Sequence, residues 1–124
     1  MAYQSYRDLV AWQKARAWVR QVYQVSQRLP SDERFGLTSQ LRRAAVSVPA
    51  NIAEGQARSG AREFAHHVSI ALGSLAEAET LLILASDLHY VDTQMIQPAL
   101  DDAHEIGRIL HGLLQSLHRA RVRP

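Results

Sequence analysis

Residues 42–55 read RRAAVSVPANIAEG, a helical pattern with a proline near its middle. Apolar side chains recur at helical spacing on both sides of Pro49, at positions 37, 41, 44, 48 and 52. A proline inside a helix removes one backbone hydrogen bond and crowds the carbonyl four residues earlier, here that of Ala45, at a cost of about 3 kcal/mol. The stretch therefore predicts a helix that kinks at Pro49 and is covered closely by another helix.

Two polar residues, Asn51 and Glu54, follow the proline within the same pattern. A structural role is open to both, because a carbonyl freed by Pro49 inside a helical bundle needs a hydrogen-bond partner. The same side chains are suited to fixing a contact between helices or to binding a ligand. We favour the structural role and treat Pro49, Asn51 and Glu54 as the residues of the kink.

Apolar residues at three-four spacing fill most of the remaining chain, and no strand-like alternation occurs. The longest seam is an unbroken heptad pattern from Phe64 to Ala85. Four helices are expected, over residues 6–29, 34–56, 64–85 and 92–117.

The connections between these segments are short, so neighbouring helices must be antiparallel. We therefore predict an all-α, up-down-up-down four-helix bundle with a proline-kinked second helix. Its domain covers residues 6–118, and residues 119–124 form a basic, flexible tail.

Two segments resemble a known family. Residues 6–15 (YRDLVAWQKA) resemble the opening, and residues 47–55 (SVPANIAEG) the most distinctive stretch, of a small bacterial four-helix-bundle family. That family includes proteins encoded within intervening sequences of large-subunit ribosomal RNA genes, and accessory variability proteins of diversity-generating retroelements are relatives. The resemblance runs from about residue 6 to residue 117. Most members have no assigned biochemical function, and the resemblance implies a ring-like pentamer.

The resemblance also implies an accessory or scaffold role in a nucleoprotein setting, with RNA, a nucleic-acid-handling enzyme or both as partners. We therefore expect a non-enzymatic, homo-oligomeric interaction protein. The alternative that we keep open is a metal- or small-ligand-binding bundle enzyme.

The composition is that of a chain that folds in a reducing compartment. It contains no cysteine, which excludes disulfides and zinc-thiolate sites. The first residues lack the apolar core of a signal peptide, and no apolar run approaches the roughly 20 residues that span a bilayer. We expect a cytoplasmic protein with no membrane contact. The formal net charge of +2 is too small to indicate nucleic-acid binding by itself.

The apolar stripes are wider than one bundle core requires, chiefly on the first and fourth helices. A monomer rarely leaves a large continuous apolar patch in water, so self-association is expected. The candidate interface residues are Trp18, Val22, Ile109 and Leu114. A pentamer is the best guess for the subunit number, from the resemblance.

Six arginines are candidates for binding nucleic acid or an acidic partner: Arg16, Arg20, Arg42, Arg43, Arg58 and Arg62. Repetition in a ring would multiply their contacts with phosphates. The alternative is a solvated surface in which Arg58 pairs with Glu54 or Glu63. The sequence leaves these two interpretations open. No aromatic residue is expected among the arginines, so stacking on bases is not expected either.

No constellation of residues indicates catalysis. Glu63 and His66, with Asp101 and His104, have the spacing of bundle metal ligands, but the ligand set is incomplete. Histidines 104, 111 and 118 lie about 10 Å apart along one helix face and cannot share a metal ion. We expect no catalytic residue, no metal site and no cofactor.

Overall fold

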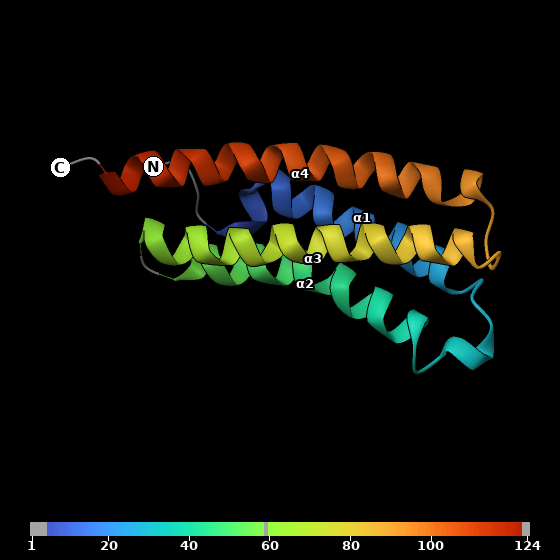
Figure 1. Cartoon of the computed structure of the whole chain (residues 1–124). Helices are drawn as coiled ribbons and strands as arrows, with labels where there is room; N and C mark the ends of the chain where they lie inside the picture. The colour runs from blue at the N-terminus through green and yellow to red at the C-terminus, as the bar shows by residue number, and fades with distance from the viewer. Residues whose placement is uncertain (1–4, 59, 123–124) are drawn as a thin grey trace.

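The computed structural model describes residues 5–58 and 60–122 of the chain. This part forms four long helices, with no strand in it, and the prediction of an all-α, four-helix fold is confirmed (Figure 1). The helices α1 and α2 pack on each other, α2 packs on α3, α3 on α4, and α4 on α1. The elements are η1 (Tyr6–Asp8), α1 (Val10–Ser26), η2 (Ser31–Glu33), α2 (Leu37–Ala57), α3 (Ala61–Asp87) and α4 (Thr93–Val122).

Residue pairs across the bundle show the direction of its helices. Ser47 of α2 meets Ser74 of α3, while Asn51, one turn later, meets His67, about two turns earlier. Residue numbers therefore run in opposite directions along α2 and α3. The colour ramp in Figure 1 shows the same alternation around the whole bundle.

The first helix starts later than expected because a separate turn precedes it. The Ser5 hydroxyl accepts a hydrogen bond from the Arg7 amide at 3.1 Å, and the Asp8 carboxylate accepts one from the Ser5 amide at 3.4 Å. This capping box closes the short 3-10 turn η1, and Leu9 is extended, with a ψ of 128°. The α-helix then begins at Val10 and ends at Ser26, before Pro30.

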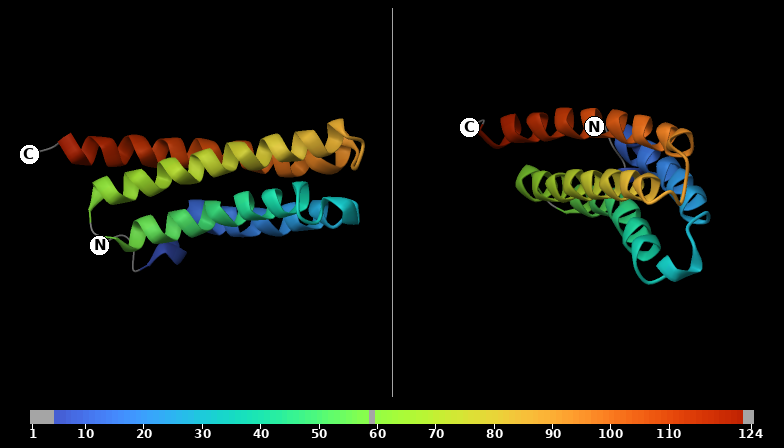
Figure 2. Two further views of the ribbon diagram at one scale, coloured as in Figure 1. Left: turned by 60° about the horizontal axis from the view of Figure 1, so that its bottom comes forward. Right: turned by 45° about the vertical axis from the view of Figure 1, so that its right-hand side comes forward.

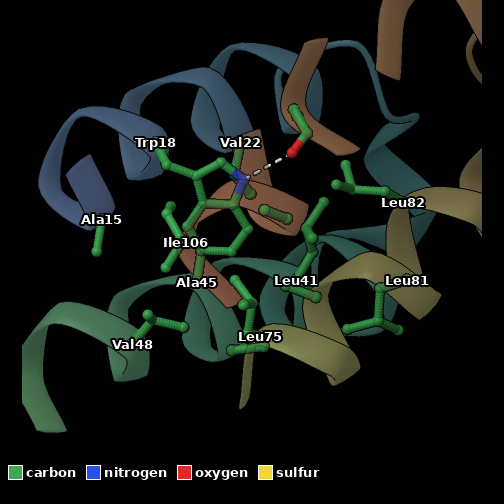
Figure 3. Packing of buried hydrophobic residues seen from close by; sticks show 14 of the residues in the cluster. Ala15, Trp18, Val22, Leu41, Ala45, Val48, Leu75, Leu81, Leu82 and Ile106 are labelled. Atoms are coloured by element: carbon green, nitrogen blue, oxygen red, sulfur yellow. Dashed lines mark hydrogen bonds between the residues drawn. The ribbon is translucent and has the colours of Figure 1, made fainter. Parts of the chain in front are cut away.

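Trp18 and Val22 lie in the core, with 1% and 0% of their surfaces exposed, and so are not candidates for a subunit interface. Figure 3 shows the Trp18 ring among core residues from several helices, with its indole nitrogen donating a hydrogen bond to the Ala99 carbonyl of α4 at 3.0 Å. The interface prediction for these two residues is wrong.

The error has a physical reason. The three-four spacing of Leu9, Trp12, Arg16, Val19, Tyr23 and Ser26 predicts that this stripe faces the core, but the buried stripe of α1 is one residue out of register with it. Its buried residues Ala11, Ala15, Trp18, Val22 and Val25 keep four-three spacing. The expected stripe, through Trp12, Arg16, Val19 and Tyr23, contains the exposed Arg16. The buried stripe gives a weak apolar signal in the sequence because it contains Ala11 and Ala15. The other stripe gives a stronger signal because it contains Trp12 and Tyr23.

The helix α2 is continuous through Pro49 but not straight. Figures 1 and 2 show it changing direction near its middle, so that its first half diverges from α3 and its second half runs beside α3. Val48 and Ile52, on either side of the proline, are fully buried. The core therefore continues across the bend.

The last helix is longer than expected. α4 continues to Val122, so residues 119–122 belong to its end and do not form a separate tail. Residues 123–124 of the expected tail lie outside the described residues.

The helix α3 is apolar over a longer stretch than expected. Within the described residues it alone has the length and composition of a membrane-spanning helix, which corrects the expectation that no segment approaches this limit. A core helix of a globular protein passes the same test, and α3 packs against both α2 and α4.

Candidate functional site

Charge is segregated along the chain and therefore between the two halves of the bundle. Residues 9–53 contain seven arginines and lysines but two acidic residues, whereas residues 54–105 contain two arginines and nine acidic residues. The first range contains α1 and most of α2, and the second contains α3 and the first half of α4. We call the first the basic half and the second the acidic half. The small net charge of the chain conceals this difference.

Aromatic rings lie beside arginines on the basic half. The Arg16 guanidinium lies 5.5 Å from the centre of the Trp12 ring, and the Arg42 guanidinium lies 4.7 Å from the centre of the Tyr23 ring. Both distances are within the range of cation–π interactions. The Tyr6 ring meets the Trp12 ring edge to face, at 5.1 Å between centres. These five residues are the aromatic–arginine row.

The rings of the two ring–arginine pairs, Trp12 and Tyr23, lie on one stripe of α1. Trp12 and Tyr23 are 11 residues apart, close to three helical turns, so they share a face about 16 Å along the helix. Both rings are half-buried, and that of Trp12 packs against the core. The expectation that no aromatic residue lies among the arginines is therefore wrong. The i,i+4 spacing of Trp12 and Arg16 could have predicted their contact, because residues with this spacing are neighbours on a helix surface.

Two of the six candidate arginines are held by other side chains. Arg42 donates from Nε to the Ser26 hydroxyl at 2.8 Å, which joins α2 to α1. Arg58 pairs with Glu54 at 2.8 Å and lies 3.9 Å from Glu63, the arrangement that the alternative interpretation predicted. Exposed ion pairs of this kind contribute little to stability.

The other four candidates are exposed but do not share one surface. Arg16 and Arg20 are on α1, in the basic half. Arg43 of α2 lies beside a shallow hollow that Glu77 of α3 also lines. Arg62 lies in the first turn of α3 and so in the acidic half. The structure therefore divides the set, and only Arg16, Arg20 and Arg42 accompany α1.

Asn51 joins α2 to α3. Its amide nitrogen donates to the Ser47 carbonyl and to the Ser47 hydroxyl, both at 2.9 Å, and its amide oxygen lies 3.0 Å from Nδ1 of His67. The amide oxygen can only accept, so His67 donates from Nδ1. The other ring nitrogen of His67 lies 3.8 Å from Glu54. Asn51 thus fixes a helix contact and does not reach the carbonyl of Ala45, which Pro49 leaves without its helical donor.

Gly55, which ends the distinctive stretch, allows the same two helices to approach. A Cβ atom at this position would lie 2.6 Å from the His67 Cβ and 3.1 Å from a Phe64 ring carbon. Gly55 and His67 are both buried. The end of the stretch is therefore explained by packing between α2 and α3.

Apolar side chains are exposed on α3 and directly after its end. Ile70, Ile83, Leu84 and Leu88 are exposed by 39% to 53%. We call the first three the α3 outer face. Ile109 and Leu114 of α4, the other two candidate interface residues, are half-buried and pack against the core.

An open groove of about 460 Å³ lies between α3 and α4. Its polar residues are Glu79, His104, Arg108 and His111. Burial raises the pKa of Glu79, and His104 partly opposes this shift. In residues 5–58 and 60–122, no three histidine, aspartate or glutamate side chains are close enough together to hold a metal ion.

The comparisons with known proteins identify relatives. A family model described as "23S rRNA-intervening sequence protein" matches residues 7–112. A solved protein of unknown function from the S23 ribosomal protein family of Bacteroides thetaiotaomicron VPI-5482 is 23% identical. The match covers 85% of this chain and 98% of that protein with a TM-score of 0.78, which supports the fold. No curated protein matches the chain. Because the family model covers most of its length, the chain belongs to the family of 23S rRNA-intervening sequence proteins.

Proposed function

We propose that this protein is a non-enzymatic, cytoplasmic, homo-oligomeric interaction protein that binds nucleic acid through its basic half. The observation that carries the proposal is the charge segregation, with seven basic and two acidic residues over positions 9–53. A one-sided positive surface attracts phosphates even when the net charge is small. The family's link to a ribosomal RNA intervening sequence favours RNA as the polymer.

The proposed assembly uses the α3 outer face. Ile70, Ile83 and Leu84 are exposed on a helix whose composition is apolar enough for a membrane span. Burying them between subunits removes apolar surface from water. A stable interface between subunits buries at least about 1,000 Å² of accessible surface in total. A pentameric ring, which the family resemblance implies, repeats the basic half in every subunit. Several weak sites that act together raise the overall affinity.

This role fits an accessory or scaffold protein in a nucleoprotein setting. A nucleic-acid-handling protein would then bind the same complex. The relation to accessory variability proteins of retroelements remains a prediction from the resemblance. The alternative, a metal- or small-ligand-binding bundle enzyme, stays a prediction from the sequence.

The test of the proposal is a salt titration of binding to RNA and to duplex DNA by the assembled protein. Binding at about 50 mM salt that falls by orders of magnitude towards 200 mM is expected for phosphate contacts. Absence of binding at the lower salt concentration would contradict nucleic-acid binding and leave protein partners for the interaction role.

A further inference from the structure

We infer that the aromatic–arginine row of α1 is a binding surface for single-stranded nucleic acid, which rests on the proposed function and specifies its site. The row consists of Tyr6, Trp12, Arg16, Tyr23 and Arg42. Single strands are bound by surfaces that combine positive charge with flat side chains on which bases stack. A duplex keeps its bases inside and offers only phosphates to such a row.

The composition around the row matches a polyanion. The helix α1 contains no acidic residue between Val10 and Ser26, and α2 contains none before Glu54. Arg20 lies one turn beyond Arg16 on α1 and is exposed, with no ion pair in the described part of the chain. The phosphates of a strand that crosses the row would therefore meet positive charge without a competing carboxylate on α1 or on the part of α2 before Glu54.

The geometry of the row matches several nucleotides. The two ring–arginine pairs are about 16 Å apart along α1. A stacked strand advances about 3.4 Å per nucleotide, so this distance covers about five nucleotides. Each pair offers a guanidinium plane lying over a ring, and bases stack on arginine planes as well as on aromatic rings.

The two pairs differ in how firmly they are held. Arg42 is fixed by its hydrogen bond to Ser26, a side chain that is 2% exposed. Arg16 has no hydrogen bond within the described residues and is exposed, so it can adjust to a base or a phosphate. We expect the Tyr23–Arg42 pair to be a rigid platform and the Trp12–Arg16 pair to be the adaptable one.

The matched variants are Arg16→Gln and Arg20→Gln, which remove the same charge from exposed positions of the same helix. Only Arg16 lies over a ring. Affinity for an oligo-uridine or oligo-adenosine RNA is measured against a duplex of the same length. We expect single strands to bind at least about tenfold more tightly than the duplex, since stacking contributes roughly 1–3 kcal/mol per base. Arg16→Gln should weaken single-strand binding about fivefold more than Arg20→Gln does.

Tryptophan fluorescence gives a second readout that requires no destabilising variant. The chain contains two tryptophans, and Trp18 is buried in the core with 1% of its surface exposed. Quenching by an added oligonucleotide should therefore arise from Trp12. The Trp12→Phe variant keeps a ring for stacking, so it should still bind but lose the quenching.

The outcomes separate this inference from the proposed function. Equal affinity for single strands and duplex, with no quenching and equal effects of the two arginine variants, would overturn the row as a stacking site while leaving electrostatic binding intact. Absence of binding to either polymer would overturn both.

Discussion

At the scale of single residues, burial separates side chains that look alike in the sequence. Trp12 and Trp18 are both tryptophans of α1, yet Trp18 is 1% exposed and bonded to Ala99, whereas Trp12 is half-buried beside Arg16. Sequence spacing put both on apolar stripes without showing which stripe faces the core. That choice depends on how α1 is rotated against α2 and α4, which is a tertiary property.

Trp18→Ala should lower the free energy of unfolding by about 3–5 kcal/mol, because it removes a fully buried ring. Trp12→Ala should cost clearly less, since part of that ring is already in contact with water. Urea denaturation of the two variants measures the difference. Equal losses would mean that the assigned rotation of α1 is wrong.

Gly55→Ala should destabilise the protein by roughly 1–3 kcal/mol, because the new methyl group would lie 2.6 Å from the His67 Cβ and force α2 away from α3. Gly112→Ala is the matched control, since nothing lies within 4 Å of a Cβ at that position of α4. The control should be neutral or stabilising by up to about 1 kcal/mol. Thermal unfolding of both variants decides whether Gly55 is required for close packing.

Glu33 links the α1–α2 connection to the α3–α4 connection at one end of the bundle and makes stability depend on pH. Its carboxylate accepts hydrogen bonds from the Leu37 amide at 3.0 Å and the Tyr90 hydroxyl at 2.9 Å. The Leu37 amide first, and then the Tyr90 hydroxyl, lower the pKa of Glu33 below its ordinary value of 4.5. The stabilisation is therefore complete above that ordinary value and is lost as the pH falls through the lowered pKa.

The matching experiment compares wild type with Glu33→Gln by urea denaturation at pH 7 and at about pH 3. We expect wild type to be the more stable protein at pH 7 and the two midpoints to converge in acid. A gap that stays constant with pH would show that the charge of Glu33 does not contribute.

At the scale of elements, the sequence predicted the four helices, but not where they end or which side chains meet across their interfaces. The seam of α3 was found because seven positions in a row keep heptad spacing. The contact of Asn51 with His67 was not predicted, because the two residues are 16 positions apart on different helices. The candidate kink residues were chosen from α2 alone, and the side chain across the interface was missed.

Asn51→Ala should weaken the contact between α2 and α3. It removes the partner of His67, which is 8% exposed, and the two hydrogen bonds to Ser47. A loss of about 1–3 kcal/mol is expected for leaving a buried polar group unpaired. Gln40→Ala, an exposed change on the same helix, should fall within about 0.5 kcal/mol of wild type. Similar losses for both would contradict a specific role for Asn51.

At the scale of the whole molecule, the basic and the acidic residues are concentrated in different halves of the bundle. The charge segregation could be found in the sequence by counting the basic and acidic residues of each half, but the net charge of +2 concealed it. The row of rings and arginines needed the structure, because Arg42 comes from α2 while Tyr23 is on α1. Trp18 and Val22 were misassigned to an interface because apolar stripes that are wide in sequence are not always exposed.

Ile83→Glu should dissociate the proposed oligomer while helix content stays high, because Ile83 is 46% exposed on the α3 outer face. Val10→Glu is the control, a 53% exposed apolar residue at the start of α1. Light scattering at micromolar concentration and circular dichroism report mass and helix content. A wild-type protein with the mass of one chain would contradict the proposed assembly.

The central claim is that the basic half, and not the overall charge, binds nucleic acid. The most direct measurement compares the salt dependence of RNA binding for Arg20→Gln/Arg28→Gln, in the basic half, with that for Arg62→Gln/Arg108→Gln, on α3 and α4. All four residues are exposed, and both variants remove two charges per chain. The account predicts that the first variant lowers the slope of log affinity against log salt by about two or more, while the second leaves it near wild type. Equal reductions in the two variants would contradict it.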